Sequence, residues 1–353
     1  MESKPCTLSL RETRALIHCE KRVEDASAYK NKFSLGVTLV EFLIASTLGL
    51  LIISAVVWSY TSSKKSYRFQ TEFWQLYERA AIAEYILTQA IHQAGYFGCA
   101  QLSKDTLVFN HLKSKDLVFQ KDYFLQGWLK RARRFLPDAK LPSAIIRHST
   151  DKSDVIKLQN MAKKTAVMIK NLNDEKRLII SNKPIYSAGQ WLAAADCHTI
   201  ELFCPLQIKQ ELLKEQQVLI TKEKLNNFKV PTQIARFKQS YFYIAKTQRK
   251  TPAGQPIFAL YQLESQNRTS ELIEGIEKMH IYYIDHQGEE RRADQVVHWH
   301  QIQAIHIKLL MHSLKPVTDS YQLYDFDQRS YTAADFLLRA EWNFIVSLKN
   351  KHG

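Results

Sequence analysis

An acidic residue lies inside the longest apolar stretch of the chain. Residues 37–60 read VTLVEFLIASTLGLLIISAVVWSY, and Glu41 is their only charged side chain. A carboxylate in such a stretch is costly unless it meets a cation, a proton or the membrane interface. Cleavage after Gly36 would create a cation, because the new amine of Val37 lies four residues before Glu41, on the same helical face. The carboxylate could also neutralise the amine of a neighbouring subunit, or snorkel to the interface.

Residues typical of an active site are sparse. His298 and His300, in the sequence HWH, would project to one face of a strand and offer a pair of metal ligands. No carboxylate motif accompanies them, so ordinary surface histidines explain the pattern better. The sequence contains no G-x-S-x-G, no H-E-x-x-H and no glycine-rich phosphate loop. We therefore predict that the protein is not an enzyme and holds no metal and no cofactor.

The chain is strongly basic, with 49 Lys and Arg against 35 Asp and Glu and a net charge of +14. Such an excess attracts nucleic acid, anionic lipid or an acidic partner. The densest basic run, KRARR at 130–134, is interpreted as a solvated face. Aromatic residues at 241–243, beside Lys238 and Lys246, could stack on single-stranded nucleic acid. Aromatic residues in a core strand explain the same pattern more simply.

The five cysteines fall into two groups. Cys6 and Cys19 precede the apolar stretch, and Cys99, Cys197 and Cys204 follow it. In an oxidising compartment the later three would form one disulfide and leave one thiol over. A zinc site is the rival interpretation, but the spacing offers no C-x-x-C.

One long helix is predicted to carry Glu41. At ~1.5 Å per residue, residues 37–60 span ~36 Å, enough to cross a bilayer core of ~30 Å. No proline occurs between Val37 and Gly95, and Gly95 supplies a stop after about 58 residues. Beyond the span, apolar residues recur at alternating steps of four and three, which favours a helical stripe packed on a sheet. The stripe consists of Phe69, Phe73, Leu76, Ala80, Ala83, Leu87, Ala90 and Ala94.

Residues 96–353 are numerous enough for a sizeable core and predict mainly antiparallel strands. Alternation with a period of two is clearest near the end of the chain. One apolar face is Ile305, Ile307, Leu309 and Met311, opposite His306, Lys308 and His312; another is Ala340, Trp342, Phe344, Val346 and Leu348. Further candidate strands are 106–109, 117–120, 154–158, 165–169, 177–181, 199–203, 217–221, 239–246 and 257–263. Residues 247–256 are typical of an exposed hairpin loop, and the fold class is α+β.

The sequence KNKFSLG at 30–36, followed by VTLVEFLIA, resembles the class III signal of type IV prepilins. The resemblance implies that residues 1–36 are a leader, which an inner-membrane prepilin peptidase removes by cutting after Gly36. The same enzyme would methylate the new amine of Val37, and Glu41 would be the assembly carboxylate. The implied fold is pilin-like: a helix at 37–95, with 37–60 in the membrane, packed on a large periplasmic β-rich domain at 96–353.

Four later segments resemble those of PilW-like minor pilins. They are AGYFGC at 94–99, GQWLAAADC at 189–197, LIEGIEKMHIYY at 272–283 and LLRAEWNFIVSLKN at 337–350. The resemblance implies a disulfide between Cys99 and Cys197, because both lie in these segments. Cys204 is then free, or is the alternative partner.

The resemblance implies a minor pilin that lies at or near the tip of a type IV pilus and primes assembly. Its partners would be other minor pilins, the major pilin, the prepilin peptidase and a tip adhesin, with inner-membrane lipid around the helix before assembly. The chain would be a single-pass inner-membrane protein and later part of the pilus at the cell surface. A minor pseudopilin of type II secretion is one alternative. A single-span periplasmic enzyme and a receptor for DNA uptake are the others.

Overall fold

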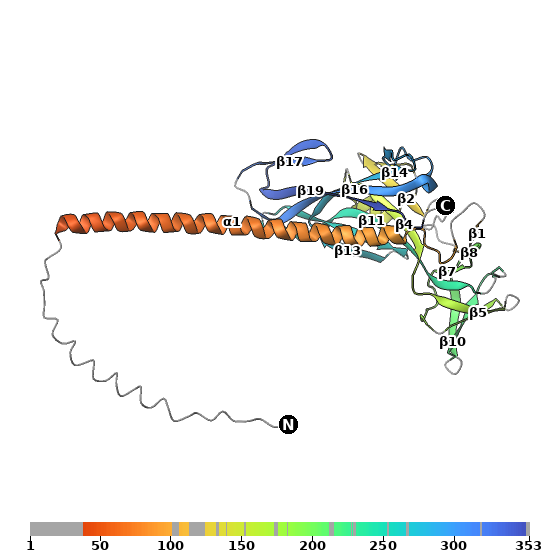
Figure 1. The fold of residues 1–353 in the computed structure, drawn as a ribbon. Coiled ribbons are helices and arrows are strands. Elements are labelled where there is room, and N and C mark those ends of the chain that lie inside the picture. Colours follow the sequence, from red (N-terminus) through yellow and green to blue (C-terminus); the bar gives the residue numbers. More distant parts are fainter. Residues whose placement is uncertain are drawn as a thin grey trace, which may run out of the picture. The chain divides into compact units, whose positions relative to one another are not determined.

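The computed structural model describes residues 38–350, apart from 101–105, 113–123, 132–133, 139, 152, 173–175, 182, 212–214, 227, 229–230, 253, 266–267 and 318–319. The leader predicted at 1–36, Val37 and the strand predicted at 117–120 lie outside the described residues. The chain divides into two units, Met1–Ser63 and Lys64–Gly353. A long helix followed by a β-rich domain rich in antiparallel strands confirms the α+β class (Figure 1).

Helix α1 (Leu39–Gln93) has 55 residues and contributes to both units. It is uninterrupted because its sequence contains no proline and a single glycine, Gly49. It ends two residues before Gly95, whose φ of +74° is the left-handed conformation that glycine adopts at helix ends. The observed helix thus agrees closely with the range predicted from the apolar stretch and the stripe.

In the first unit, all large apolar side chains from Leu39 to Tyr60 are exposed. In the second unit, α1 buries Leu76, Ala80, Ala83 and Leu87, four of the residues predicted as a stripe. These four side chains share one hydrophobic cluster with residues of the strands, so the prediction that the stripe packs on a sheet is confirmed. Phe69 lies outside the buried stripe, with 39% of its surface exposed.

Nineteen strands of the described residues form two sheets and a hairpin (Figure 1). The first sheet contains β1 (Leu107–Asn110), β2 (Leu125–Arg131), β3 (Arg134–Leu136), β4 (Val155–Met161), β5 (Ala166–Leu172), β6 (Arg177–Ser181), β7 (Leu192–Ala195), β8 (Thr199–Phe203), β9 (Pro205–Glu211), β10 (Gln216–Thr221), β11 (Gln233–Lys250), β12 (Pro256–Glu264) and β13 (Arg268–Glu274). The second sheet has the order β15 (Glu290–Arg291), β14 (Ile276–Asp285), β16 (Ile302–Pro316), β19 (Leu337–Ser347). The hairpin is β17 (Gln322–Phe326) with β18 (Arg329–Ala333). The short helices are α2 (Ser143–His148) and the 3-10 turn η7 (Trp299–Gln301).

The long strand β11 joins two parts of the first sheet. Its first residues pair with β7 and β5, and its later residues pair with β4 on one side and β12 on the other. The described pairs are antiparallel except β1 with β8, which run parallel. Cys99 precedes β1 and Cys197 precedes β8, and a disulfide joins the two cysteines. The parallel pairing of β1 with β8 is a departure from the antiparallel expectation.

Two details of the strand predictions are wrong. The loop predicted at 247–256 is shorter, because β11 continues to Lys250 and β12 begins at Pro256. His312, expected on the polar face of β16, is 1% exposed because both faces of β16 are covered at that end. Its ring lies edge-on to Phe258 of β12, and its backbone N–H donates to the carbonyl of Gly275. The apolar face from Ile305 to Met311 is fully buried, as predicted.

Candidate functional site

Glu41 and Thr38 form a capping box at the start of α1. The backbone N–H of Thr38 donates to Glu41 Oε2 at 3.0 Å, and the N–H of Glu41 donates to Thr38 Oγ1 at 3.2 Å. The two residues thereby satisfy donors that the first turn of a helix otherwise leaves without partners. Glu41 is also favoured there by the positive end of the helix dipole. The carboxylate therefore has partners in its own chain. Gly36 and Val37 lie outside the described residues.

The apolar part of α1 has the length and composition of a membrane span. It is the one helix among the described residues that meets both criteria, and none of its most apolar window is buried. A β-rich domain follows it in the chain. These features fit a single-pass membrane protein.

The end of α1 is held by three contacts from distant parts of the second unit. A disulfide joins Cys99 to Cys197, which is the pairing that the resemblance implied. The side-chain amide of Asn350 donates to the carbonyls of His92 at 2.9 Å and Ala94 at 3.3 Å. The N–H of Gly95 donates to a carbonyl of β4 at 2.9 Å. The closing segment and the disulfide thus fix the place where the helix enters the domain.

Gly95 and Gly98 are required at this junction. Both have positive φ angles, +74° and +69°. A Cβ on Gly95 would lie 2.7 Å from the backbone carbonyl oxygen of Asn350. Gly95 therefore serves close packing around the helix end, and both glycines serve its left-handed backbone.

The other residues considered from the sequence do not form a site. His298 and His300 do not lie on a strand: His298 precedes η7 and His300 belongs to it, with ring centroids 5.6 Å apart. No group of three residues able to hold a metal ion occurs in the part of the chain that the structure describes. The aromatic residues at 241–243 are buried in the core, which rules out their exposure as a stacking platform. Cys204 is half-buried and unpaired, and burial raises the pKa of its thiol, which disfavours the reactive thiolate.

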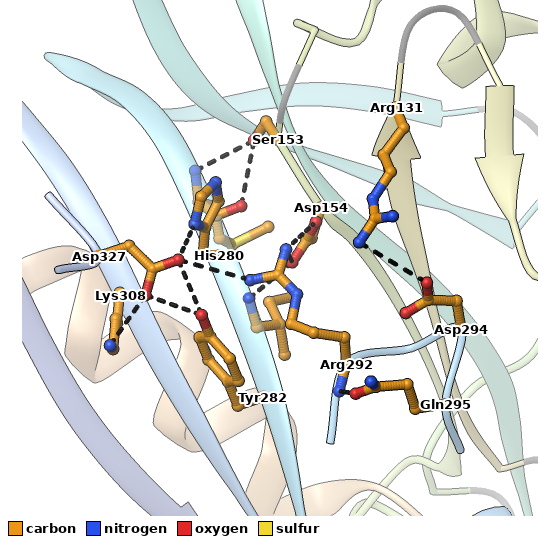
Figure 2. Close-up of polar contacts among 12 residues, drawn as sticks. Arg131, Ser153, Asp154, His280, Tyr282, Arg292, Asp294, Gln295, Lys308 and Asp327 are labelled. Atoms are coloured by element: carbon orange, nitrogen blue, oxygen red, sulfur yellow. Dashed lines mark hydrogen bonds and ion pairs between the residues drawn. The ribbon is translucent and has the colours of Figure 1, made fainter. Parts of the chain in front are cut away.

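A polar site that sequence analysis missed lies on the second sheet, on the face opposite the hydrophobic core. Figure 2 shows its centre, Asp327, at the turn between β17 and β18. Tyr282 donates to the Asp327 carboxylate at 2.7 Å, and Lys308 Nζ donates to it at 2.9 Å. His280 Nδ1 lies 2.7 Å from Asp327 Oδ2. Although burial alone raises the pKa of Asp327, the hydrogen bonds from Lys308, Tyr282 and His280 outweigh it and lower that pKa well below its usual value.

Two local features position the side chains of this site: the alternation of side chains along β14 and the tight turn between β17 and β18. On β14, Met279 and Ile281 point into the core, so His280 and Tyr282 point to the opposite face. The hairpin turns over two residues with positive φ, 51° at Asp327 and 61° at Gln328. Such turns match the twist of the two strands but usually contain Asn or Gly. Asp-Gln is a weak signal, which explains why the hairpin was not predicted.

Arg292 connects this carboxylate to a second, fully buried one. Its guanidinium donates to Asp154 at 2.8 Å and lies 3.8 Å from Asp327 (Figure 2). The N–H of Ile281 also donates to Asp154, at 2.7 Å. Loss of solvent nevertheless raises the pKa of Asp154 to about 7, against the effects of Arg292 and of this hydrogen bond. The two aspartates flank one arginine and share its charge.

The basic run at 130–134 is only partly a solvated face. Lys130 is buried, with 6% of its surface exposed, whereas Arg131 and Arg134 are exposed. The ammonium group of Lys130 donates to the carbonyl of Ser149 at 2.6 Å and lies 3.2 Å from the carboxylate of Asp151. These partners satisfy the buried ammonium group, which is why this part of the prediction is wrong.

Comparison of the chain with family models, with curated proteins and with solved structures gave no match.

Proposed function

We propose that this chain is a PilW-like minor pilin, which enters a type IV pilus at or near its tip and primes assembly with other minor pilins. The observation that carries the proposal is the division of α1. One part, beyond its capped first turn, exposes its large apolar side chains and has no charged residue before Lys64, and the other is built into the core of a β-rich domain. This division suits a subunit whose apolar helix moves from lipid into a bundle of similar helices while its domain remains in water.

The start of α1 supports the same proposal. The class III signal predicts cleavage after Gly36 and a methylated amine at Val37. Glu41 lies four residues after that position in the sequence, and its carboxylate accepts a hydrogen bond from the N–H of Thr38 at the first turn of the helix. In this proposal the charge of Glu41 neutralises the amine of a neighbouring subunit inside the fibre. This subunit then lies beneath another, because its carboxylate needs an amine to bind.

The first experiment is mass spectrometry of the N-terminus in membrane fractions and in sheared pili. The proposal expects a chain that begins with methylated Val37 in both fractions. An uncut N-terminus, in cells with an active prepilin peptidase, would overturn it. Absence of the chain from sheared pili, with Val37 correctly processed, would favour a minor pseudopilin.

A pair of substitutions separates the two roles open to Glu41. Glu41→Gln keeps a side chain that can complete the capping box but removes the charge, whereas Glu41→Ala removes both. If the charge serves assembly, both variants lose pili, as counted by electron microscopy. If only the cap matters, Glu41→Gln remains piliated. Glu78→Ala, on an exposed position of the same helix, is the matched control and should leave piliation unchanged.

A further inference from the structure

A pocket of about 740 Å³ lies between β2, the second sheet and the β17–β18 hairpin. Its volume is within the range of sites that bind small molecules. Its lining contains two carboxylates, Glu290 and Asp327, and six cationic side chains. The cations are Lys130, Arg131, Lys278, Arg292, Lys308 and Arg329. They come from five separate places in the sequence, so the fold gathers positive charge here.

The inner wall of the pocket is fixed by ion pairs that use up part of this charge. Lys308 is paired with Asp327 at 2.9 Å, and Arg292 with Asp154 at 2.8 Å. Glu290 lies 2.8 Å from His306. These groups hold one another in place, so the carboxylates of the wall repel an incoming anion less than free carboxylates would.

In the outer part of the pocket, two arginine side chains make few contacts with the rest of the protein. Arg131 has 66% of its side-chain surface exposed, and its nearest acidic contact is Asp294 at 3.9 Å. Arg329, at the start of β18, is exposed, and its guanidinium has no hydrogen bond or ion pair among the described residues. Both guanidinium groups are available to a ligand, and their planar donors fit phosphate and carboxylate oxygens.

The aromatic rings of the pocket favour a compact anion over a nucleic acid. Arg292 lies 4.7 Å and Lys308 5.1 Å from the ring centre of Tyr282. Lys278 lies 4.9 Å from that of Tyr331. Proteins that bind single-stranded nucleic acid use aromatic faces on which its bases can stack. Here cations already lie over those faces, so the pocket offers charge rather than stacking.

We propose that this pocket binds a compact anion that carries two or more phosphate or carboxylate groups. Several groups are needed because one phosphate ion would occupy only a small part of the volume and could not reach all the cations. Arg131 and Arg329 bind the outer groups, and the inner wall orients the rest. This binding site is independent of pilus assembly and goes beyond the function proposed above.

The test is isothermal titration calorimetry on the full-length protein in a non-ionic detergent at low ionic strength. Tripolyphosphate and citrate are the two probes. The probe that binds with the higher affinity shows whether the pocket prefers phosphate or carboxylate groups. The variant Arg131→Gln/Arg329→Gln should raise the Kd of the preferred probe at least about tenfold, because it removes two charge-assisted contacts. Its thermal unfolding should match the parent protein, since both side chains are exposed.

The matched control is Lys170→Gln/Lys209→Gln, which makes the same change of net charge at exposed positions of β5 and β9. It should change the affinity by less than about twofold. Equal weakening in the two variants would show diffuse electrostatics and overturn the proposal, as would the absence of saturable binding of either probe. A single-stranded oligonucleotide that displaces the bound probe and binds more tightly would overturn the restriction to compact anions.

Discussion

From Leu39 to Ser63, helix α1 exposes its large apolar side chains, whereas from Lys64 to Gln93 it buries one stripe of side chains and leaves the others half-buried or exposed. The backbone hydrogen bonds are the same in both parts, so the difference lies in what surrounds the side chains. In the first part a membrane or a bundle of apolar helices must supply the surroundings. In the second part the β-rich domain supplies them. Substitutions in the two parts should therefore affect different measurements, and the following predictions test that division.

The largest effect is expected at the disulfide in the segment that follows α1. The Cys99–Cys197 disulfide joins residues 98 apart in sequence, so Cys99→Ser should lower the free energy of unfolding of the domain by about 4 kcal/mol. Urea unfolding of the full-length protein in detergent, followed by tryptophan fluorescence, measures this change. Cys204→Ser is the control and should cost less than about 1 kcal/mol. Equal losses in the two variants would show that the cross-link does not stabilise the domain.

The second prediction compares one leucine from each part of α1. Leu87 is fully buried and Leu50 is 67% exposed. Leu87→Ala should lower the free energy of unfolding by about 3 kcal/mol, because it removes buried contacts and leaves a cavity. Leu50→Ala should change the same quantity by less than about 0.5 kcal/mol. The same urea experiment measures both variants, and similar losses would contradict the division of the helix.

The helix and most of the strands could be predicted because their signals are local. A run without proline, steps of four and three, and alternation along β16 and β19 each depend on neighbouring residues. The His298–His300 pair shows the limit of such reasoning. Two residues separated by one position suggest a strand face, but three residues are too few to distinguish a strand from the 3-10 turn observed.

The basic pocket could not be predicted, because it depends on pairing between distant segments. Lys130, Lys278 and Arg329 are far apart in sequence and line one space only after β2, β14 and the β17–β18 hairpin have packed. Each is an ordinary surface lysine or arginine in the sequence. The burial of Lys130 likewise depends on the carbonyl of Ser149, which no local pattern indicates.

The third prediction concerns pH and applies to the second unit alone. The pKa of Asp154 is raised to about 7 in the folded protein, mainly by burial, while Asp327 and Asp294 add to the increase and Arg292 opposes it. Between pH 4 and 7 the folded state therefore holds a proton that the unfolded state has released. Stability falls as the pH rises through this window, by about 2 kcal/mol between pH 5 and 6.5, and this contribution levels off above about pH 7.

Urea unfolding at several pH values, for the parent protein and for Asp154→Asn, isolates this contribution. The variant cannot titrate at that position, so its stability should lose this part of the pH dependence. Asp138→Asn, at an exposed position, should follow the parent protein at every pH. The same pH dependence in Asp154→Asn and the parent protein would show that Asp154 is ionised throughout the window.

The smallest effect is expected at the end of α1. The Asn350 side chain donates to the carbonyls of His92 and Ala94, which the end of the helix leaves without backbone partners. Asn350→Ala should lower the free energy of unfolding by about 1 kcal/mol, the usual contribution of such hydrogen bonds. Asn343→Ala, at an exposed position of β19, is the control and should cost less than about 0.5 kcal/mol. If the two variants lose the same stability, Asn350 does not fix the helix end, and the second part of α1 is held in the domain by its buried stripe, the disulfide and the N–H of Gly95.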